Sequence, residues 1–361
     1  MNESGSLNIS GWTCPRPLQN YPTIVLGHGS GGKMMADLIQ HLFVASFGND
    51  LLGQMGDSTI IDILAELKDR NSEKIAFTTD SFVVSPLFFP GGNIGELSIY
   101  GTVNDLAMSG ATPLYLSAGL ILEEGLPMET LGVVIESMAN ACRLTDTQII
   151  AGDTKVVNKG HGDGMFINTT GIGIIPDGVE ISAKAARPGD LILVNGSIGD
   201  HGMAIMSVRA GLEFESKIKS DTAPLSLLTR ILLQTTHEIH CMRDMTRGGL
   251  AAALNELSTA SNVGLEFHEE SVPIHPEVAA ACEMLGLDPF YTANEGKLVC
   301  ILPESQAQRI LSAMQSHPLG KEAAIIGNVV DSHPGMVVAH TAIGGKRVVD
   351  LPAGELLPRI C

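Results

Sequence analysis

Apolar extended runs alternate with helical patterns along most of the chain, and this alternation stops once, between Pro176 and Asp190, before it resumes. The interruption divides the 361 residues into two parts, each long enough to bury a hydrophobic core of its own. Because strands and helices are mixed in both parts, we predict two domains of α/β or α+β class, in which helices pack on sheets.

The apolar patterns predict individual elements on both sides of this interruption. In the first part we expect strands over residues 23–26, 59–64, 74–79, 114–122, 148–151 and 165–175, and helices over residues 33–46, 94–109 and 128–143. In the second part we expect strands over residues 191–194, 264–268, 297–302, 324–330 and 347–350, and helices over residues 200–209, 224–236, 248–261, 276–285 and 304–315. The expected domain organisation is an amino-terminal extension over residues 1–22, a first domain over 23–180, a second over 181–346 and a tail over 347–361.

Charge and cysteine content exclude several classes of protein. The formal net charge is −18, so the surface repels phosphate backbones and nucleic acid is not an expected partner. Six cysteines occur without a CxxC pair, which indicates neither a zinc ribbon nor a disulfide framework and favours a reducing cytoplasm. The amino terminus is polar and no apolar run approaches the length of a membrane span, so we expect no signal peptide and no association with a membrane.

A glycine-rich segment follows the first expected strand and reads Gly27-His28-Gly29-Ser30-Gly31-Gly32-Lys33-Met34. It fits the GxGxxG dinucleotide pattern and the GxxxxGK Walker pattern. However, Met34 lacks the hydroxyl that a Walker loop offers to Mg²⁺, and no clean strand-borne acid follows at the Rossmann distance. Glycines still let backbone N–H groups approach a phosphate, and a lysine at a helix start adds positive potential. We therefore predict a phosphate-binding loop, with an ordinary strand-to-helix turn as the alternative. His28 could contact phosphate, act as a base or simply pack.

Five aspartates stand at positions suited to metal binding, namely Asp57, Asp80, Asp105, Asp153 and Asp244. Asp80 closes the apolar run IAFTTD, Asp153 closes IIAGD, and Asp105 lies among apolar or small residues. Carboxylates in such places need a compensating charge, and Mg²⁺ bridged to the phosphates of ATP would supply it. Any one of them alone is more typical of a turn or a cap, so the prediction depends on the five converging in space.

Two further segments have competing interpretations. His237, His240 and Cys241 in HEIHC are potential soft-metal ligands, but the spacing is not HExxH and no second cluster completes a site, so we interpret them as packing at a helix end. The terminal LPAGELLPRIC carries Pro352 and Pro358, which resist incorporation into a helix or sheet, and it predicts an extended, mobile arm. A frayed terminus is the alternative.

Several segments are informative in combination: HGSGGK, TTDSF, GTVNDLAMSGA, AGDTKVV, RDMTRGGLA, NEGKL and the terminal PRIC. With these the chain resembles the HypE family of hydrogenase maturation proteins, which belongs to the ATP-binding superfamily of aminoimidazole ribonucleotide synthetase, selenophosphate synthetase and thiamine monophosphate kinase. The resemblance runs from about Thr23 to Cys361. The terminal PRIC is its most specific element, because the sibling enzymes have no reason to end in cysteine. Met245 stands where the family usually has proline, which predicts a looser turn after Asp244.

The resemblance implies a set of site residues. It implies that ATP is bound by the glycine-rich loop and Asn104, with the loop residues being His28, Gly29, Gly31, Gly32 and Lys33. It implies Mg²⁺ binding by the five aspartates. The implied catalytic residues are the terminal Cys361, Glu295 of NEGK and Lys155 of GDTK.

The resemblance also implies a reaction and a fold. A carbamoyl group on the Cys361 sulfur would be dehydrated to a thiocyanate after ATP phosphorylates its oxygen, with Glu295 as the base for the nitrogen and Lys155 paired with Glu295. The implied fold has an ATP-binding first domain that forms a shared β-barrel in a homodimer, and an α/β sandwich as the second domain. The implied partners are the HypF carbamoyltransferase and the HypC–HypD complex.

Two alternatives remain at this point. The chain could be a sibling ATP-dependent synthetase or kinase that acts on a free substrate, as selenophosphate synthetase does. It could also be a docking scaffold whose ATP site is regulatory. For the pair Glu295 and Lys155, a structural salt bridge is the alternative to a catalytic role.

Overall fold

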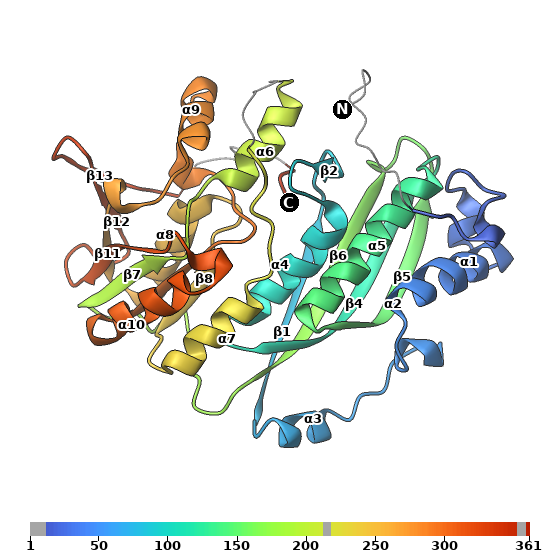
Figure 1. Cartoon of the computed structure of the whole chain (residues 1–361), viewed down its shortest axis with the longest axis horizontal. Helices are drawn as coiled ribbons and strands as arrows, with labels where there is room; N and C mark the ends of the chain where they lie inside the picture. Colours follow the sequence, from blue (N-terminus) through green and yellow to red (C-terminus); the bar gives the residue numbers. More distant parts are fainter. Residues whose placement is uncertain (1–11, 212–217, 352–358) are drawn as a thin grey trace.

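Each half of the molecule is built on one sheet, and the two sheets differ in size (Figure 1). The structure is a computed structural model, and it describes residues 12–211, 218–351 and 359–361. The sheet of the first half has the strand order β1-β6-β4-β5. Its strands are β1 (Lys74–Phe82), β4 (Thr112–Glu123), β5 (Gln148–Val157) and β6 (Met165–Ile175). β6 runs antiparallel to both neighbours, whereas β4 and β5 are parallel and are joined through a helix.

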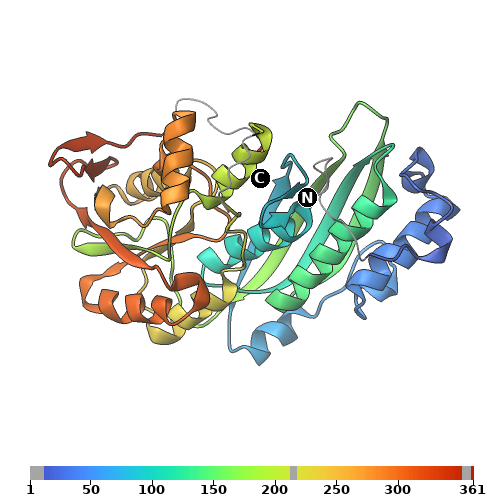
Figure 2. The same cartoon turned by 45° about the horizontal axis from the view of Figure 1, so that its top comes forward.

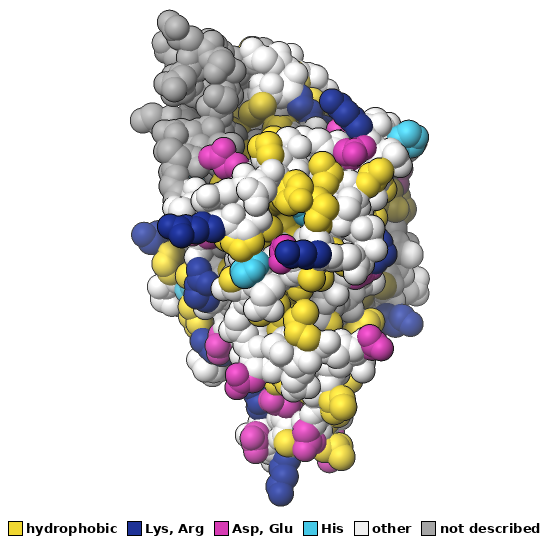
Figure 3. Space-filling model, turned by 90° about the vertical axis from the view of Figure 1, so that its right-hand side faces the viewer, with side chains coloured by type: hydrophobic (Ala, Val, Ile, Leu, Met, Phe, Trp, Pro, Cys, Tyr) yellow, Lys and Arg dark blue, Asp and Glu magenta, His cyan; other side chains and the backbone are white. Residues whose placement is uncertain are grey.

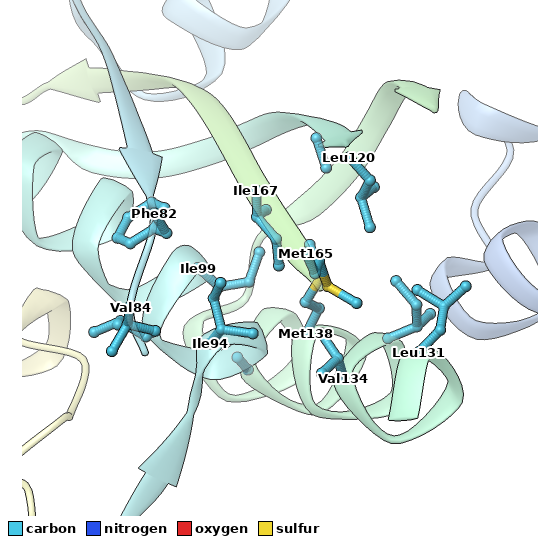
Figure 4. Close-up of a cluster of buried hydrophobic side chains, with 14 of the residues drawn as sticks. Phe82, Val84, Ile94, Ile99, Leu120, Leu131, Val134, Met138, Met165 and Ile167 are labelled. Atoms are coloured by element: carbon cyan, nitrogen blue, oxygen red, sulfur yellow. The ribbon is translucent and has the colours of Figure 1, made fainter. Parts of the chain in front are cut away.

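Helices α4 (Ile94–Met108) and α5 (Met128–Thr145) cover one face of this sheet. The apolar residues of α5 recur at helical spacing, so Leu131, Val134 and Met138 all point towards the sheet and are fully buried (Figure 4). Asn93 caps α4 by accepting the backbone N–H of Gly95 at 2.8 Å. The first half therefore has one apolar core between the helix pair and the sheet.

The opposite face of the same sheet is apolar but exposed. Strand alternation places Ile75, Phe77 and Ile121 on this face, where they are 49%, 68% and 44% exposed. Thr79 and Ser81 lie on the same side of β1 and are also exposed. This open sheet face is defined here by Ile75, Phe77, Thr79, Ser81 and Ile121.

The segment before β1 forms short helices, most of them at the end of the molecule next to β5, whereas the last lies apart near the start of β1 (Figure 1). They are η1 (Arg16–Leu18), η2 (Leu26–Gly29), α1 (Lys33–Leu38), η3 (Ile39–Val44), α2 (Ala45–Phe47), η4 (Leu52–Gln54) and α3 (Ile63–Asp69). α1, η3 and α2 follow one another without a break, so they form one continuous helical rod. Hydrophobic side chains gather among charged ones on this end of the molecule (Figure 3).

The second half contains a sheet of seven strands in the order β13-β12-β9-β11-β7-β10-β8. These are β7 (Asp190–Val194), β8 (Cys241–Asp244), β9 (Gly264–His268), β10 (Leu298–Pro303), β11 (Ala324–Val330), β12 (Val337–His340) and β13 (Lys346–Val348). Its helices are α6 (Asp200–Arg209), α7 (Ser226–Thr235), α8 (Gly249–Ser261), α9 (Pro276–Leu285) and α10 (Glu304–Gln315). The remaining elements are the two-stranded β2 (Phe88–Phe89) and β3 (Gly92–Asn93), and the turns η5 (Glu269–Ser271), η6 (Pro289–Tyr291) and η7 (Pro318–Gly320).

The halves meet along α4. Ala107 and Met108 at the end of α4 belong to one apolar cluster with Leu225 and Leu228 around α7, so the cluster spans the boundary between the halves. The turned view shows the two halves side by side with the carboxy terminus between them (Figure 2). None of the described helices combines the length and apolarity that crossing a membrane requires.

Several predicted elements differ from the structure. Residues 23–26 form no strand, because Thr23 makes a single bridge to Pro127. Residues 59–64 form no strand either, since the chain enters α3 at Ile63. The patterns missed β8 and β12, which are four residues each and too short to show a period. Ordered chain also continues past residue 347, because β13 pairs with β12.

Candidate active site

The last residue of the chain lies in a cleft between the two halves. Cys361 lines this cleft together with residues from β1, α4, β8 and two loops of the second half, namely Asp80, Asp105, Asp244, Arg247 and Glu295. Asp80 and Cys361, the first and last of these residues, are more than 280 positions apart along the chain. The packing of the second half against α4 brings them together. We call this set the terminal-cysteine cleft.

Backbone pairing holds the end of the chain in the cleft. The N–H of Val83 donates to the Cys361 carbonyl at 3.1 Å, and the N–H of Ser85 donates to the Arg359 carbonyl at 3.3 Å. The Ile360 side chain is 1% exposed and belongs to the apolar core of the first half. The predicted mobile arm is therefore docked at its last three residues, while residues 352–358 lie outside the described chain.

The Cys361 thiol is held in its neutral form in this position. Burial, with the nearby charge of Glu295 adding to it, raises the pKa of the Cys361 thiol. The neighbouring Arg359 does not offset this rise, because its guanidinium forms an ion pair with Asp163. The docked thiol is thus a poor nucleophile.

Glu295 is the most unusual carboxyl group of the cleft. It is 4% exposed, and its Oε1 atom has no hydrogen-bond partner. Burial, followed by the charge of Asp221, raises the pKa of Glu295 well above its usual value. The adjacent backbone is fixed, because the N–H groups of Glu295 and Gly296 donate to the Asp221 carboxylate at 3.1 and 3.3 Å. A rigid, desolvated carboxyl with a free oxygen has the properties of a general base awaiting its substrate.

Three of the predicted metal ligands also face the cleft. Asp80 comes from the end of β1, Asp105 from α4 and Asp244 from the end of β8. Burial raises the pKa of all three carboxyl groups, and the charge of Asp105 adds to the effect on Asp244, whose pKa reaches about 7. The Asp105 carboxylate accepts the Thr78 hydroxyl at 2.9 Å. The cleft therefore concentrates negative charge that a cation would relieve.

The five predicted aspartates do not form one cluster in a single chain. Asp57 and Asp153 line a different cavity, beside β5 and the α1–α2 rod. Among the described residues, no group of three or more His, Cys, Asp or Glu side chains is arranged to hold a metal ion by itself. Mg²⁺ usually takes only one or two protein carboxylates and completes its shell with water and substrate phosphates, so the cleft fits a nucleotide-bound Mg²⁺ better than a protein cage.

Lys155 does not contact Glu295 within one chain. Its ammonium group lies 2.5 and 2.7 Å from the two carboxylate oxygens of Asp153, two residues earlier on β5. Strand alternation makes residues i and i+2 neighbours on one face, and both side chains are largely exposed there. The expected pair of Lys155 with Glu295 is therefore wrong for the isolated chain.

The glycine-rich loop departs from the expected strand-to-helix turn. Its first part is the short helix η2, in which His28 is buried and its Nδ1 accepts the N–H of Val25 at 3.0 Å, while its Nε2 has no partner. Gly29 packs against β5, where an added Cβ would lie 2.6 Å from the backbone nitrogen of Val156. Gly31 and Gly32 are followed by Lys33 at the start of α1, and an added Cβ on either glycine would meet nothing within 4 Å. The second part of the loop has the open backbone that a phosphate requires.

Asn104 stands in the framework of the site. Its amide nitrogen donates to the carbonyls of Ala223 and Glu295 at 3.1 and 3.2 Å, and its oxygen accepts the N–H of Leu225 at 2.7 Å. Both the nitrogen and the oxygen of the Asn104 amide are therefore used, and they attach the turn that carries Glu295 to helix α4. Asn104 is thus placed to orient the base, and its implied role as a nucleotide ligand competes with three backbone contacts.

Sequence reasoning missed two charged residues of the site. Arg247 lines the cleft with Cys361, Asp80 and Asp105, and its positive charge partly offsets the rise that burial causes in the pKa of each. In the sequence it was visible only as part of RDMTRGG. Asp221 carries no local motif and is recognised only by its contacts with the Glu295 turn. The predicted looser turn after Asp244 is also wrong, because the Met245 N–H donates to the Lys297 carbonyl at 3.1 Å, a bond that proline could not make.

The amino-acid sequence and the fold both match known proteins. The families described as AIR synthase related protein, N-terminal domain, and AIR synthase related protein, C-terminal domain, match residues 56–175 and 187–339. The protein named carbamoyl dehydratase HypE of Bradyrhizobium diazoefficiens is 52% identical over 337 residues, 93% of this chain and 95% of its own length.

Solved structures agree with this assignment. The structure of hydrogenase maturation protein HypE in complex with ATP is 46% identical, covers 94% of this chain and 100% of its own, and superposes with a TM-score of 0.89. A structure of a HypE–HypF complex, also 46% identical, covers 87% of this chain and 99% of its own with a TM-score of 0.75. On the strength of these matches over nearly its whole length, the chain belongs to the HypE carbamoyl dehydratases, a branch of the AIR synthase related proteins.

Proposed function

We propose that this chain uses ATP to convert a carbamoyl group on the sulfur of Cys361 into a thiocyanate, which supplies cyanide for the iron of NiFe-hydrogenase. One observation carries the proposal: the terminal Cys361 is docked in a cleft beside a buried carboxyl, Glu295, and three further acids. A merely frayed terminus would have no reason to bury Ile360 and to place a sulfur there. Relatives that bear the name carbamoyl dehydratase support the assignment.

The residues around the cleft fit ATP and Mg²⁺. Asp80, Asp105 and Asp244 would offer carboxylate oxygens to Mg²⁺, and their partial burial next to one another fits a site that a cation would stabilise. Gly31, Gly32 and Lys33 do not line this cleft in one chain; their open backbone lies at the end of the molecule next to β5 and would face phosphate oxygens if a second copy brought the two together. A solved relative is described as a complex with ATP, which supports the nucleotide.

ATP, when bound, supplies the phosphoryl group that turns the carbamoyl oxygen from a poor into a good leaving group. The carbamoyl nitrogen has to lose two protons. Glu295 would take one through its unpartnered Oε1, held by the contacts of Asp221 and Asn104 with its backbone, and the departing phosphate would carry the other. Arg247 contributes positive charge to a cleft that is otherwise acidic. The buried terminus excludes water that would hydrolyse an activated carbamoyl group.

The terminal sulfur has to visit partners as well as the cleft. HypF would load the carbamoyl group, and a solved relative is described as a HypE–HypF complex. A HypC–HypD complex would accept the cyanide. Since the docked Cys361 thiol is neutral and only partly exposed, both exchanges would need the terminus to leave the cleft.

A homodimer would complete the site. The open sheet face carries exposed Phe77 and Ile121, and a second copy facing it would bury them and close two sheets into a barrel. Asp153 and Lys155 stand on that face of β5, so a second copy would carry them towards the partner's cleft. We therefore propose that Lys155 serves the cleft of the other subunit.

The decisive experiment follows the mass of the terminal peptide. Protein carbamoylated on Cys361 is incubated with Mg-ATP, and mass spectrometry should show the loss of one water from that peptide together with ATP turnover. Retention of the water while ATP is consumed contradicts the proposal. Cys361→Ser should abolish loading and turnover, whereas Cys14→Ser, at the other partly exposed cysteine, should change neither.

The same variants separate the alternatives. A sibling synthetase acting on a free substrate would retain ATP turnover with that substrate in Cys361→Ser. A docking scaffold with a regulatory nucleotide site would bind ATP without releasing phosphate in proportion to loaded protein. Calorimetry for ATP binding and a stoichiometric phosphate assay distinguish these outcomes.

A further inference from the structure

We infer that His201, on helix α6, is the positioning residue that holds the reactive terminus in the cleft and ties its arrival to the Glu295 turn. The inference rests on the proposed function for its meaning, because it concerns how the carrier residue is presented to the base. It starts from a contact that neither the chemistry nor the predicted motifs required. The Nε2 atom of His201 lies 2.8 Å from the carbonyl oxygen of Ile360, the residue before Cys361.

The partners of His201 fix its protonation. A carbonyl oxygen can only accept, so Nε2 carries the hydrogen and donates to Ile360. Nδ1, 2.8 Å from the Ser220 hydroxyl, is then the acceptor of the neutral ring. Ser220 in turn accepts from the Thr222 hydroxyl at 2.6 Å and from the Thr222 N–H at 3.1 Å. Every polar atom in this chain of contacts has one consistent role.

The surroundings of His201 leave it no other task. The ring is fully buried, and Phe89 packs edge-on against it with ring centres 5.4 Å apart. Burial lowers the pKa of His201, which agrees with a neutral ring. A buried histidine whose donor nitrogen is aimed at a chain terminus would lose that partner whenever the terminus left, so the contact specifically favours the docked state.

Helix α6 contacts the terminus at both of its ends. His201 stands in its first turn, and Arg209 is its last residue. Arg209 donates from Nε to the Ser85 carbonyl at 2.6 Å and from its guanidinium to the Arg359 carbonyl. The carbonyls of Arg359, Ile360 and Cys361 are therefore all satisfied in the docked state, by Ser85 and Arg209, by His201 and by Val83 respectively.

The residue that holds His201 is adjacent to the residue that holds the base. Ser220 buttresses the His201 ring, and the next residue, Asp221, accepts the N–H groups of Glu295 and Gly296. Displacement of the ring when the terminus leaves would act on this same short segment. The peptide unit between Ser220 and Asp221 thus links His201 to Glu295. Glu295 is held in its position beside the sulfur only when the terminus is docked.

The test uses the reactivity of Cys361 and needs neither ATP nor a carbamoyl group. His201→Phe keeps a ring beside Phe89 and removes the donor, so the terminus should undock more often and the alkylation rate of Cys361 by iodoacetamide should rise about five- to tenfold, the loss expected for one buried hydrogen bond. His201→Gln keeps a donor and should restore part of the protection. Ser207→Ala, on the same helix with its hydroxyl bonded inside the helix, is the matched control and should alkylate at the wild-type rate.

A second readout tests the link to the base. With carbamoylated protein, His201→Phe should lower kcat for water loss by more than the small loss of docked terminus alone would, because Glu295 is displaced as well. KM for ATP should stay unchanged, because the nucleotide residues are untouched. Should His201→Phe not fold, Ser220→Ala removes the buttress and carries the same expectation. Alkylation at the wild-type rate in both variants overturns the inference. If the wild-type protein is protected from alkylation but its carbamoylated form never loses water, the proposed function is refuted. The inference about His201 would then still stand.

Discussion

Glu295 and Asp244 share a physical situation that a folded chain adopts only for function: they are buried carboxyl groups beside other carboxyl groups. Burial and neighbouring acids raise the pKa of both, well above its usual value for Glu295 and to about 7 for Asp244. Such an arrangement destabilises the isolated chain. It is useful only if a cation and a substrate take up the charge during the reaction.

Replacing Glu295 by Gln tests the base at this scale. Glutamine is nearly isosteric and leaves the backbone bonds from Glu295 and Gly296 to Asp221 intact, but it cannot accept a proton. We expect water loss from carbamoylated Cys361 to fall by about 10²–10⁴-fold, with ATP affinity preserved. In the wild type, water loss should decline as the pH falls through the raised pKa of Glu295, since only the carboxylate is a base. Glu322→Gln, on an exposed side chain, is the control, and unchanged turnover in Glu295→Gln refutes the assignment.

Asp244→Asn should stabilise the protein while inactivating it. The folded pKa of about 7 exceeds the reference value of 3.8, so between these values the folded state holds a proton that the unfolded state has released. The free energy of unfolding of the wild type therefore falls as pH rises through this window. Asp244→Asn cannot lose a proton there, so its free energy of unfolding does not fall for this reason. We expect a gain of about 1–3 kcal/mol at pH 7.5 in EDTA, and a smaller difference near pH 4. Urea titrations measure it, with exposed Asp331→Asn as the control; an equal pH slope in Asp244→Asn and wild type would contradict the account.

The sequence identified the acidic residues of the cleft but not how they are grouped. Asp80, Asp105 and Asp244 stand at element ends and in a motif, which is a local signal, and they do meet in the cleft. Asp221 has no such signal, because its role is to accept two backbone N–H groups from a distant turn. The roles of Glu295 and Cys361 came from the resemblance, since a lone acid and a terminal cysteine carry no chemistry of their own.

At the scale of elements, the glycine-rich loop divides into a packing part and an open part. Gly29 faces the backbone of Val156, whereas Gly32 faces open space and has φ of −90°, which alanine can adopt. Gly29→Ala should therefore lower the free energy of unfolding by about 1–3 kcal/mol. Gly32→Ala should leave stability unchanged but weaken ATP binding, because a methyl group would occupy the approach to the loop backbone.

Denaturation curves and calorimetry with ATP measure the two effects separately. The two variants are controls for each other, since the same substitution is made three residues apart. Equal ATP affinity in Gly32→Ala and wild type would remove the loop from the nucleotide site. Unchanged stability in Gly29→Ala would contradict its close packing against β5.

Elements were predictable where their period was long enough. The helices α6, α9 and α10 and the strands β6, β9 and β11 have the predicted limits. In α10 and β6 the reason is plain, because buried residues recur at the helix or strand period along the element. Thr23 and Thr59 begin runs just as rich in β-branched residues, yet they pair with no sheet beyond one bridge. The preference of these residues for extended backbone is the same as in the true strands. Whether such a run becomes a strand depends on whether another strand lies beside it.

At the scale of the whole molecule, the second half covers the end of α4 and leaves the far face of the first sheet open. The division into two mixed domains followed from the sequence, whereas the open face did not, since alternation shows which residues share a face but not what covers it. Phe77 at 68% exposure is a large apolar side chain without cover in the described chain. In the proposed homodimer, a second copy would cover this face and would give Lys155 a cleft to serve.

Complementation between two inactive variants tests whether Lys155 acts across subunits. We expect Lys155→Ala and Glu295→Gln to be inactive alone. In a mixed dimer, one cleft combines Glu295 of the first chain with Lys155 of the second and is intact, while the other cleft lacks both. A heterodimer purified through two different tags should therefore regain roughly half of the wild-type activity per dimer, because one of two equivalent sites is restored.

The controls for this experiment come from the same surface. Phe77→Glu places a charge on the open sheet face and should yield monomers in sedimentation analysis, and in this background no mixing should restore activity. If the two residues acted within one chain, both clefts of the heterodimer would carry one defect and the mixture would stay inactive. Activity on mixing that requires Phe77 thus identifies the dimer as the catalytic unit, because neither chain alone holds Lys155 and Glu295 in the same cleft.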